Sequence, residues 1–529
     1  MRKFICVIIS ITTIITVKAQ PKRFNPKPFK YEKQIELYNN DYEAHLLSMT
    51  SFSFDDYFNL ISQIGGTKPD DGGKQKILSF ISNKGYTTQS TSAKDIKNLY
   101  KDIHALFLTH YVENPSFNEI FTSGGYNCAT ATALYALTLD RLAINYSIHE
   151  KPTHVYIIAD PNASNIIFET TTPGMKTLQV TDKLKSLFMN YLVDNKIVTQ
   201  SEAAGDQKDI LFDKYFYGDE KIDLKKLAGL LYYNIGIDKY IAQDYPTACK
   251  NFEKAYILYP SKRIEYFLTE SLQAVLEQNQ NNINNKVWAY YLRSIDLNPT
   301  EHEKNALKDY WNYVLSKCFF ETPNPELAHS MYTTMLPYIQ DTSLGNSIKY
   351  DYYYNMAHLF NIKNKLDSSI QYLDSAYAIN PQNLLIHDLI TKTLTEDFSN
   401  NAASADTALL SNIDKAYGKY PFLDKKGKIE DIYMYVLARD ISKFYESDNK
   451  IEGERYFLSF QKRAKNEPDI LKKSEVYCSP AFVNAYYYYI RHKQYKEGKH
   501  FLETALTYFP NNVELNKRMK NITSILANQ

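Results

Sequence analysis

The sequence predicts a chain in two parts, a small α+β unit followed by an all-α array of helical repeats. Near residue 128, an apolar, alanine-rich segment is followed by short β-branched runs, which is the order of helix and strands in a mixed unit. Beyond about Leu224 the strand signals vanish and aromatic-rich helical pairs recur. The 529 residues also exceed the roughly 250–300 residues that one hydrophobic core supports.

The first residues carry the features of an export signal. Residues 1–19 have two basic residues directly after Met1, then an apolar run of about fifteen residues and the closing triplet VKA, an order that is typical of a signal peptide. We expect cleavage near Gln20 and a periplasmic or extracellular protein. No later stretch approaches the roughly twenty apolar residues of a bilayer crossing, so no transmembrane segment is expected. The basic, proline-punctuated residues 20–30 are predicted to form an extended arm.

The α+β unit is expected over residues 31–222. In the segment IKNLYKDIHALFLTHYV, apolar residues recur at three- and four-residue steps, which is typical of a helix. The loop FTSGGYN then leads into CATATALYALTLDRLAI, which is predicted to be a buried helix that begins at or near Cys128. The runs HVYIIA and NIIFETT are separated by the turn residues DPNAS and predict a β-hairpin.

The helical array is expected over residues 223–529. Its segments share an aromatic-rich helix, a short polar turn, a second helix and a closing proline. The closing prolines, 38 to 47 residues apart, are Pro260, Pro299, Pro337, Pro381, Pro421, Pro468 and Pro510. The segments resemble tetratricopeptide repeats, although the usual period of about 34 residues is shorter. Stacked helical pairs form concave surfaces, so a protein or peptide partner is expected, and the alternative is that the tyrosines only pack the core.

Composition excludes several classes of partner and site. The 61 basic and 60 acidic residues nearly balance, so neither nucleic acid nor an anionic membrane is expected as a partner. No phosphate loop, HExxH, CxxC pair or EF-hand spacing occurs, so no cofactor and no metal are expected. The cysteines after the signal, which do not form a disulfide framework, are Cys128, Cys249, Cys318 and Cys478. The oligomeric state stays open.

Cys128 lies where the predicted loop meets the predicted helix. A helix N-terminus lowers the pKa of a thiol because unpaired backbone N–H groups face the sulfur, and Asn127 is a favoured N-cap residue. The Cys128 N–H is one candidate oxyanion donor, and Tyr126 or Asn127 is a candidate for the second. Taken alone, a cysteine that opens an apolar helix is also typical of a small buried hydrophobic residue.

His154 and Glu169 are candidates for the base and the orienting acid that a thiol nucleophile requires. With the turn DPNA, facing residues of the hairpin sum to 323, which sets His154 opposite Glu169, whereas a longer turn makes them diagonal neighbours. Asp160 is about 20 Å from His154 along an extended strand and is rejected as the acid. A surface histidine and a solvated glutamate are the alternatives. His149 and Glu150 are expected to be ordinary surface residues.

The segments SGGYNCATATALYALTLDRLAI, PTHVYIIA and IIFETT resemble the core of the transglutaminase-like superfamily, over roughly residues 90–175. The resemblance implies a nucleophile at Cys128, a general base and acid at His154 and an orienting carboxylate at Glu169. It implies an exported cysteine amidase, peptidase or acyltransferase. Many members have an aspartate where this chain has Glu169, and many have an aromatic residue where it has Val155. Because some members have lost catalysis, an inactive binding scaffold is the alternative.

Overall fold

The chain forms two compact units. The first contains residues up to Tyr313 together with Thr333–Ile339, and the second contains Val314–Tyr332 and the residues from Gln340 onward. The computed structural model describes residues 30–65, 70–151, 154–168, 170, 182–216, 221–284, 286–404, 408–466 and 468–528. The expected signal peptide and residues 20–29 of the expected arm lie outside these residues.

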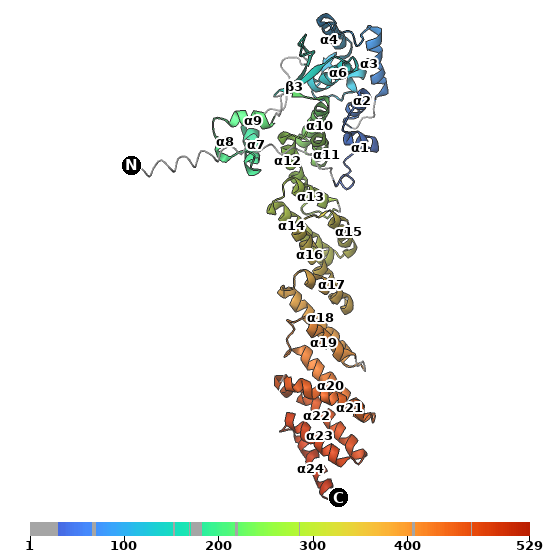
Figure 1. Cartoon of the computed structure of the whole chain (residues 1–529), viewed down its shortest axis with the longest axis vertical. Helices are drawn as coiled ribbons and strands as arrows, with labels where there is room; N and C mark the ends of the chain where they lie inside the picture. Colours follow the sequence, from blue (N-terminus) through green and yellow to red (C-terminus); the bar gives the residue numbers. More distant parts are fainter. Residues whose placement is uncertain are drawn as a thin grey trace, which may run out of the picture. The chain divides into compact units, whose positions relative to one another are not determined.

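The first unit combines helices with short strands (Figure 1). Its N-terminal elements are α1 (Asp41–Ser48), α2 (Phe54–Ser62), α3 (Asp71–Asn83), α4 (Ala93–Phe107), β1 (His110–Tyr111), α5 (Glu119–Thr122), β2 (Gly125–Tyr126), α6 (Cys128–Arg141), β3 (Tyr146–Lys151), β4 (His154–Ala159) and β5 (Ile166–Phe168). They are followed by α7 (Asp182–Asp194), α8 (Gln200–Ala204), α9 (Lys208–Phe216), β6 (Lys221–Ile222), α10 (Leu224–Ile241), α11 (Tyr245–Leu258), α12 (Lys262–Asn279) and α13 (Val287–Leu297).

The sheet of the first unit is larger than the predicted hairpin. Its strands lie in the order β5-β4-β3-β6, and each neighbouring pair is antiparallel. The predicted strand 154–159 is confirmed as β4, whereas β5 begins at Ile166, two residues after the start at residue 164 that the turn DPNA implies. The turn is longer because Asp160 and Asn165 both adopt positive φ, and the Asn165 N–H donates to the Asp160 carbonyl oxygen at 2.8 Å.

Helix α6 forms the centre of this core, and its burial confirms the sequence prediction. Every residue from Ala129 to Leu139 is buried. The Tyr135 ring lies 5.0 Å from the Phe168 ring of β5, in a T-shaped arrangement. Phe168 faces Ile157 of β4, and both side chains are fully buried. The helix therefore packs against one face of the β4–β5 pair.

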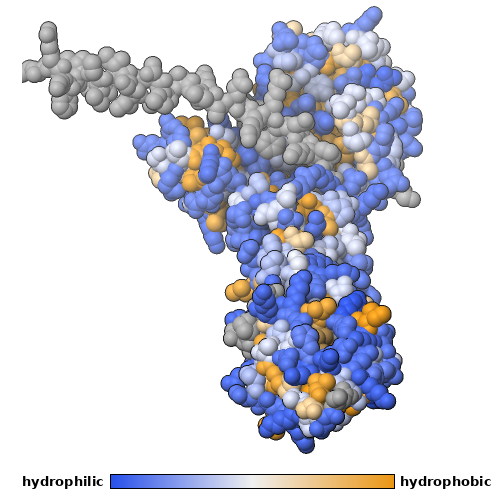
Figure 2. Space-filling view, turned by 60° about the horizontal axis from the view of Figure 1, so that its bottom comes forward, coloured by the Kyte–Doolittle hydropathy of each residue, from blue (hydrophilic) through white to orange (hydrophobic). Residues whose placement is uncertain are grey.

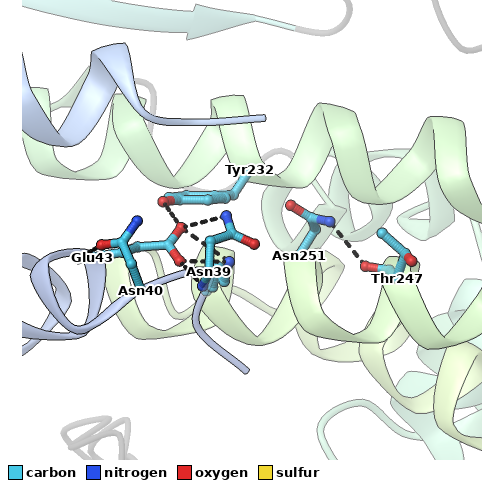
Figure 3. Close-up of polar contacts among 7 residues, drawn as sticks. Asn39, Asn40, Glu43, Tyr232, Thr247 and Asn251 are labelled. Carbon is cyan, nitrogen blue, oxygen red and sulfur yellow. Dashed lines mark hydrogen bonds and ion pairs between the residues drawn. The ribbon is translucent and has the colours of Figure 1, made fainter. Parts of the chain in front are cut away.

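The described N-terminal residues are tied to the helices that follow β6 (Figure 3). The fully buried Glu43 carboxylate of α1 accepts hydrogen bonds from the Tyr232 hydroxyl of α10 at 2.7 Å and from the Lys254 ammonium of α11 at 2.9 Å. Upstream, the Tyr31 hydroxyl donates to the Asp296 carboxylate of α13 at 3.1 Å. The predicted boundary at residues 222/223 marks a change of secondary structure, and the first unit continues through α13 beyond it.

The second unit is built of helices in the described residues. Helix α14 (Glu301–Ser316) and helix α15 (Pro325–Met335) contain residues of both units. The remaining elements are η1 (Lys317–Glu321), η2 (Leu336–Tyr338, in the first unit), α16 (Thr342–Ile362), α17 (Leu366–Ile379), α18 (Leu384–Ala402), α19 (Leu409–Lys419), α20 (Lys428–Glu446), α21 (Lys450–Asn466), α22 (Pro468–Arg491), α23 (Tyr495–Tyr508) and α24 (Val513–Ala527).

The predicted helical region is confirmed in its coarse form. Most closing prolines stand just after a helix, as Pro260 does after α11 and Pro381 after α17. Pro468 instead opens α22, because proline is well tolerated in the first turn of a helix, where its missing N–H has no partner to lose. Tetratricopeptide geometry in the strict sense remains a prediction.

Candidate functional site

Asn127 caps the helix that Cys128 opens. The Asn127 side-chain oxygen accepts from the Thr130 N–H at 2.9 Å, and the Thr130 hydroxyl oxygen accepts from the Asn127 N–H at the same distance. The Asn127 side-chain amide donates to the Glu113 carbonyl oxygen at 3.1 Å. The predicted N-cap is therefore confirmed. Both ends of this side chain serve the fold, so its second role as an oxyanion donor stays a prediction.

Cys128 is the accessible thiol among the described cysteines. Its residue is half-buried, whereas Cys249, Cys318 and Cys478 are buried. Burial raises the pKa of the thiol at each of these three positions, and for Cys478 to about 12. Because the thiolate is the nucleophile, the three buried cysteines are chemically inert near neutral pH.

Tyr111 is a neighbour of Cys128 that sequence reasoning missed. The Cys128 N–H donates a hydrogen bond to the Tyr111 hydroxyl oxygen. Burial, and next the charge of Cys128, raise the pKa of Tyr111 to about 12, so the phenol is neutral near pH 7. Strand β1 carries Tyr111 and pairs with β2, where Tyr111 faces Tyr126. The Cys128 N–H, which is the predicted oxyanion donor, is therefore already bonded to the Tyr111 hydroxyl oxygen. A substrate carbonyl oxygen would have to replace that hydroxyl group.

The start of α6 lies at the end of the sheet where β4 begins. The Thr132 hydroxyl, one helical turn after Cys128, donates to the Val155 carbonyl oxygen at 3.2 Å. Further along α6, Tyr135 contacts Phe168, which is level with Ile157. The helix therefore runs in the same direction as β4, and its first turn lies toward the start of that strand, where His154 is located.

His154 projects from the other face of β4. Val155, Ile157 and Ala159 are buried on the side of α6, so alternation directs His154 and Tyr156 to the opposite side. The His154 and Tyr156 rings stack at 5.8 Å with an interplanar angle of 16°. The first turn of α6 thus lies beside the strand of His154 but against the other face of that strand, and a Cys128–His154 pair remains a prediction.

Glu169 lies outside the described residues. The register on which its pairing was predicted is corrected, because facing residues of β4 and β5 sum to 325, as in Ile157 with Phe168, rather than 323. This is the alternative with the longer turn. Asp160 serves that turn, since its carboxylate accepts from the Ser164 N–H at 2.8 Å, in agreement with its rejection as the orienting acid.

His149 and Glu150 are buried, so the expectation that they are ordinary surface residues was wrong. They are 5% and 6% exposed. The Glu150 carboxylate lies 2.5 Å from the Arg263 guanidinium of α12 and accepts from the Tyr259 hydroxyl at 2.9 Å. The local sequence of β3 gives no sign of these partners, because they follow more than a hundred residues later.

A second candidate site is a groove between α19, α20 and α21 of the second unit. The groove is open to solvent and has a volume of about 630 Å³. Its lining residues are Leu410, Ser411, Asp414, Lys415, Tyr433, Arg455, Tyr456 and Ser459. The Arg455 guanidinium carbon lies 4.9 Å from the centre of the Tyr456 ring. The face of the molecule shown in Figure 2 is mainly hydrophilic, with hydrophobic residues in small patches.

Among the described residues, no group of three or more histidine, cysteine, aspartate or glutamate side chains is placed to hold a metal ion. No described helix combines the length and the apolar character that crossing a membrane requires.

Comparisons with known proteins assign no family. No protein family matches the sequence, and no curated protein matches it. Among solved structures, one of Naa15/Naa10 bound to HypK-THB is 13% identical, with a TM-score of 0.17, and the match covers 65% of this chain and 61% of that chain. A human IFIT1 dimer with m7Gppp-AAAA is 12% identical, with a TM-score of 0.15, over 94% of this chain and 92% of the other. This chain thus spans about three fifths of the first.

Proposed function

We propose that this protein is an exported helical-repeat scaffold that binds a protein or peptide partner. The groove lined by α19, α20 and α21 is the observation that carries the proposal. Tyrosine and arginine, which are enriched among residues that dominate binding energy, line it together. Its volume of about 630 Å³ suits several side chains of an extended segment.

The charges of the groove favour an acidic segment. The Asp414 carboxylate is already engaged, because it accepts from the Tyr433 hydroxyl at 3.2 Å and lies 3.4 Å from the Arg463 guanidinium. Lys415 is exposed, and the Arg455 side chain is 62% exposed. The Arg455 guanidinium already lies 2.5 Å from the Glu452 carboxylate, so its remaining N–H groups and the Lys415 ammonium are the donors that a partner's carboxylates could reach.

Crosslinking in the full-length protein tests the groove. A photoreactive amino acid at Ser411 should capture a partner in the native host, whereas the same residue at Lys520, an exposed position of α24, should not. With the captured partner purified, Lys415→Glu and Arg455→Glu should each weaken binding by about tenfold or more, because each places a carboxylate against an acidic segment. Equal capture at both positions, or binding that neither substitution weakens, would refute this assignment.

A second candidate function is supported by the position of Cys128, the half-buried thiol at a capped helix start. As a cysteine amidase, peptidase or acyltransferase, the protein would use the Cys128 thiolate to attack an amide carbonyl. A C–S bond forms, the C–N bond breaks, and His154 gives its proton to the leaving amine. Water then attacks the thioester while His154 takes a proton from it, and the thiolate is restored. An amine in place of water gives acyl transfer. Glu169 would orient the imidazole.

Selective alkylation tests the thiol. At pH 6, limiting iodoacetamide should label Cys128 rapidly in the wild type and slowly in His154→Ala, and mass spectrometry identifies the modified cysteine. The buried Cys249 and Cys478 serve as internal controls that stay unlabelled in the folded protein. Equal slow labelling of Cys128 in both proteins would count against the enzyme and leave the scaffold as the function.

A further inference from the structure

Three aromatic side chains form a continuous stack on the face of β3 and β4 that carries His154. The Tyr156 ring lies between the two histidines, 5.8 Å from the His154 ring and 5.2 Å from the His149 ring. The interplanar angles are 16° and 18°, so the three rings are nearly parallel. Strand register explains the arrangement, since Tyr156 follows His154 by two residues and faces His149 directly across the ladder.

The end of the stack opposite His154 is held in place. His149 is only 5% exposed, and its Nε2 lies 2.8 Å from the Ser147 hydroxyl oxygen, on the same face of β3. The Lys151 ammonium lies 5.2 Å from the centre of the Tyr156 ring, and Lys151 faces His154 in the register. Tyr156 is therefore fixed by its neighbours before it contacts His154.

We propose that Tyr156, itself fixed by His149, is a positioning residue that sets the ring plane of His154. This inference rests on the thiol function proposed for Cys128. The χ2 torsion of a histidine is broad, so an imidazole at the first residue of a strand needs external contacts to hold one orientation. A parallel ring on one side removes most of that freedom. Fixing the plane also fixes the directions of the two ring nitrogens, through which a base accepts and returns a proton.

The stack also places the face of an aromatic ring beside the imidazole that becomes charged during the reaction. When His154 takes the thiol proton, the imidazolium lies against the face of an aromatic ring, and a cation is attracted to such a face. The attraction needs the ring and not the Tyr156 hydroxyl. A phenylalanine at position 156 should therefore replace Tyr156, and an aliphatic side chain should not.

The test compares Tyr156→Leu with Tyr156→Phe in the full-length protein. The rate of Cys128 alkylation at pH 6 should fall by about 2- to 10-fold in Tyr156→Leu, the range that the loss of one aromatic contact implies. It should stay at the wild-type level in Tyr156→Phe. Lys151→Gln, which removes the neighbouring ammonium and leaves the rings in place, should also leave it unchanged. Equal rates in the leucine and phenylalanine variants would overturn the proposal.

A second readout separates this inference from the thiol function. In protein labelled with ¹³C at histidine Cε1, the ring signal of His154, assigned with His154→Gln, should carry a ring-current shift that persists in Tyr156→Phe and is lost in Tyr156→Leu. If Cys128 proves unreactive, the thiol function fails while this signal still reports the stack. If Tyr156→Leu does not fold, His149→Leu and His149→Phe are compared instead. The His154 signal should move in His149→Leu, which loses the ring that fixes Tyr156, and should stay in place in His149→Phe. A His154 signal that neither leucine variant moves would refute the stack.

Discussion

Removing the arginine of the buried Glu150–Arg263 pair should strongly destabilise the first unit. The two side chains are 4% and 6% exposed, and the Arg263 guanidinium carbon lies 4.7 Å from the Tyr233 ring centre. The Glu150 carboxylate accepts hydrogen bonds from the Arg263 guanidinium and the Tyr259 hydroxyl. In Arg263→Met it stays buried and retains the hydrogen bond from Tyr259 alone. Losing one partner of such a pair typically costs about 3–5 kcal/mol. With a urea dependence of about 3 kcal/mol per molar, the unfolding midpoint should fall by roughly 1–2 M.

The two tryptophans make this measurement specific for the first unit. Trp288 and Trp311 both belong to it and are 1% exposed, so their fluorescence reports its unfolding, whereas circular dichroism at 222 nm reports both units. In Arg263→Met the fluorescence transition should shift, and the circular dichroism transition should shift only in the part that the first unit contributes. The double variant Glu150→Met/Arg263→Met should recover most of the loss, because no buried charge then remains. Lys286→Met removes an exposed partner of Glu36 and should shift nothing measurable. If Arg263→Met behaves like Lys286→Met, the burial argument is wrong.

Three further predictions use the same two signals. Burial, and next the charge of Glu277, raise the pKa of Glu270. The folded state therefore binds the Glu270 proton more tightly than the unfolded state does, and the free energy of unfolding falls as pH rises above about 4.5. Glu270→Gln should raise the urea midpoint of the fluorescence transition at pH 7, and a gain of the same size at pH 4 would contradict this explanation. Gly236→Ala places a Cβ 2.6 Å from the Phe252 ring and should destabilise the first unit by about 1–3 kcal/mol, measured by fluorescence. A Cβ at Gly418 in α19 has no atom within 4 Å, so Gly418→Ala should stabilise the second unit by about 0.5–1 kcal/mol, measured by circular dichroism. If Gly236→Ala stabilised the protein and Gly418→Ala destabilised it, the packing argument would be refuted. Asn127→Ala removes the cap of α6 and should cost about 1 kcal/mol in the fluorescence transition, and Asn127→Asp, which retains a capping oxygen, should cost less.

Local patterns carried the predictions that succeeded. The buried α6, its Asn127 cap and β4 follow from apolar content, capping chemistry and β-branching within a few residues of each feature. Most of the closing prolines likewise stand two residues after the last residue of a helix. These signals are short in range, which is why a single sequence reveals them.

Long-range contacts caused the failures. The polar residues of β3, Ser147, His149 and Lys151, suggest an exposed segment when the sequence is considered alone. In the fold, the Arg263 guanidinium neutralises the neighbouring Glu150 carboxylate, and the Tyr259 hydroxyl donates a hydrogen bond to it. The hairpin register was wrong by two because positive φ at Asp160 and Asn165 lengthened the turn. Tyr111 escaped notice because a two-residue parallel pairing, and no local motif, brings it to Cys128.

The attachment of residues 31–43 to α10, α11 and α13 limits how this chain can be recombined. A cut at the change of secondary structure near residue 222 separates the Lys254 ammonium from Glu43 and the Arg263 guanidinium from Glu150, leaving four charged groups without the partner that neutralises each. Joining a foreign repeat array to residues 31–222 would leave Glu43 and Glu150 without Lys254 and Arg263 in the same way. The part of the chain that can be transferred as one piece therefore extends through α13. A gene fusion that keeps the α+β elements must also keep the helices α10 to α13.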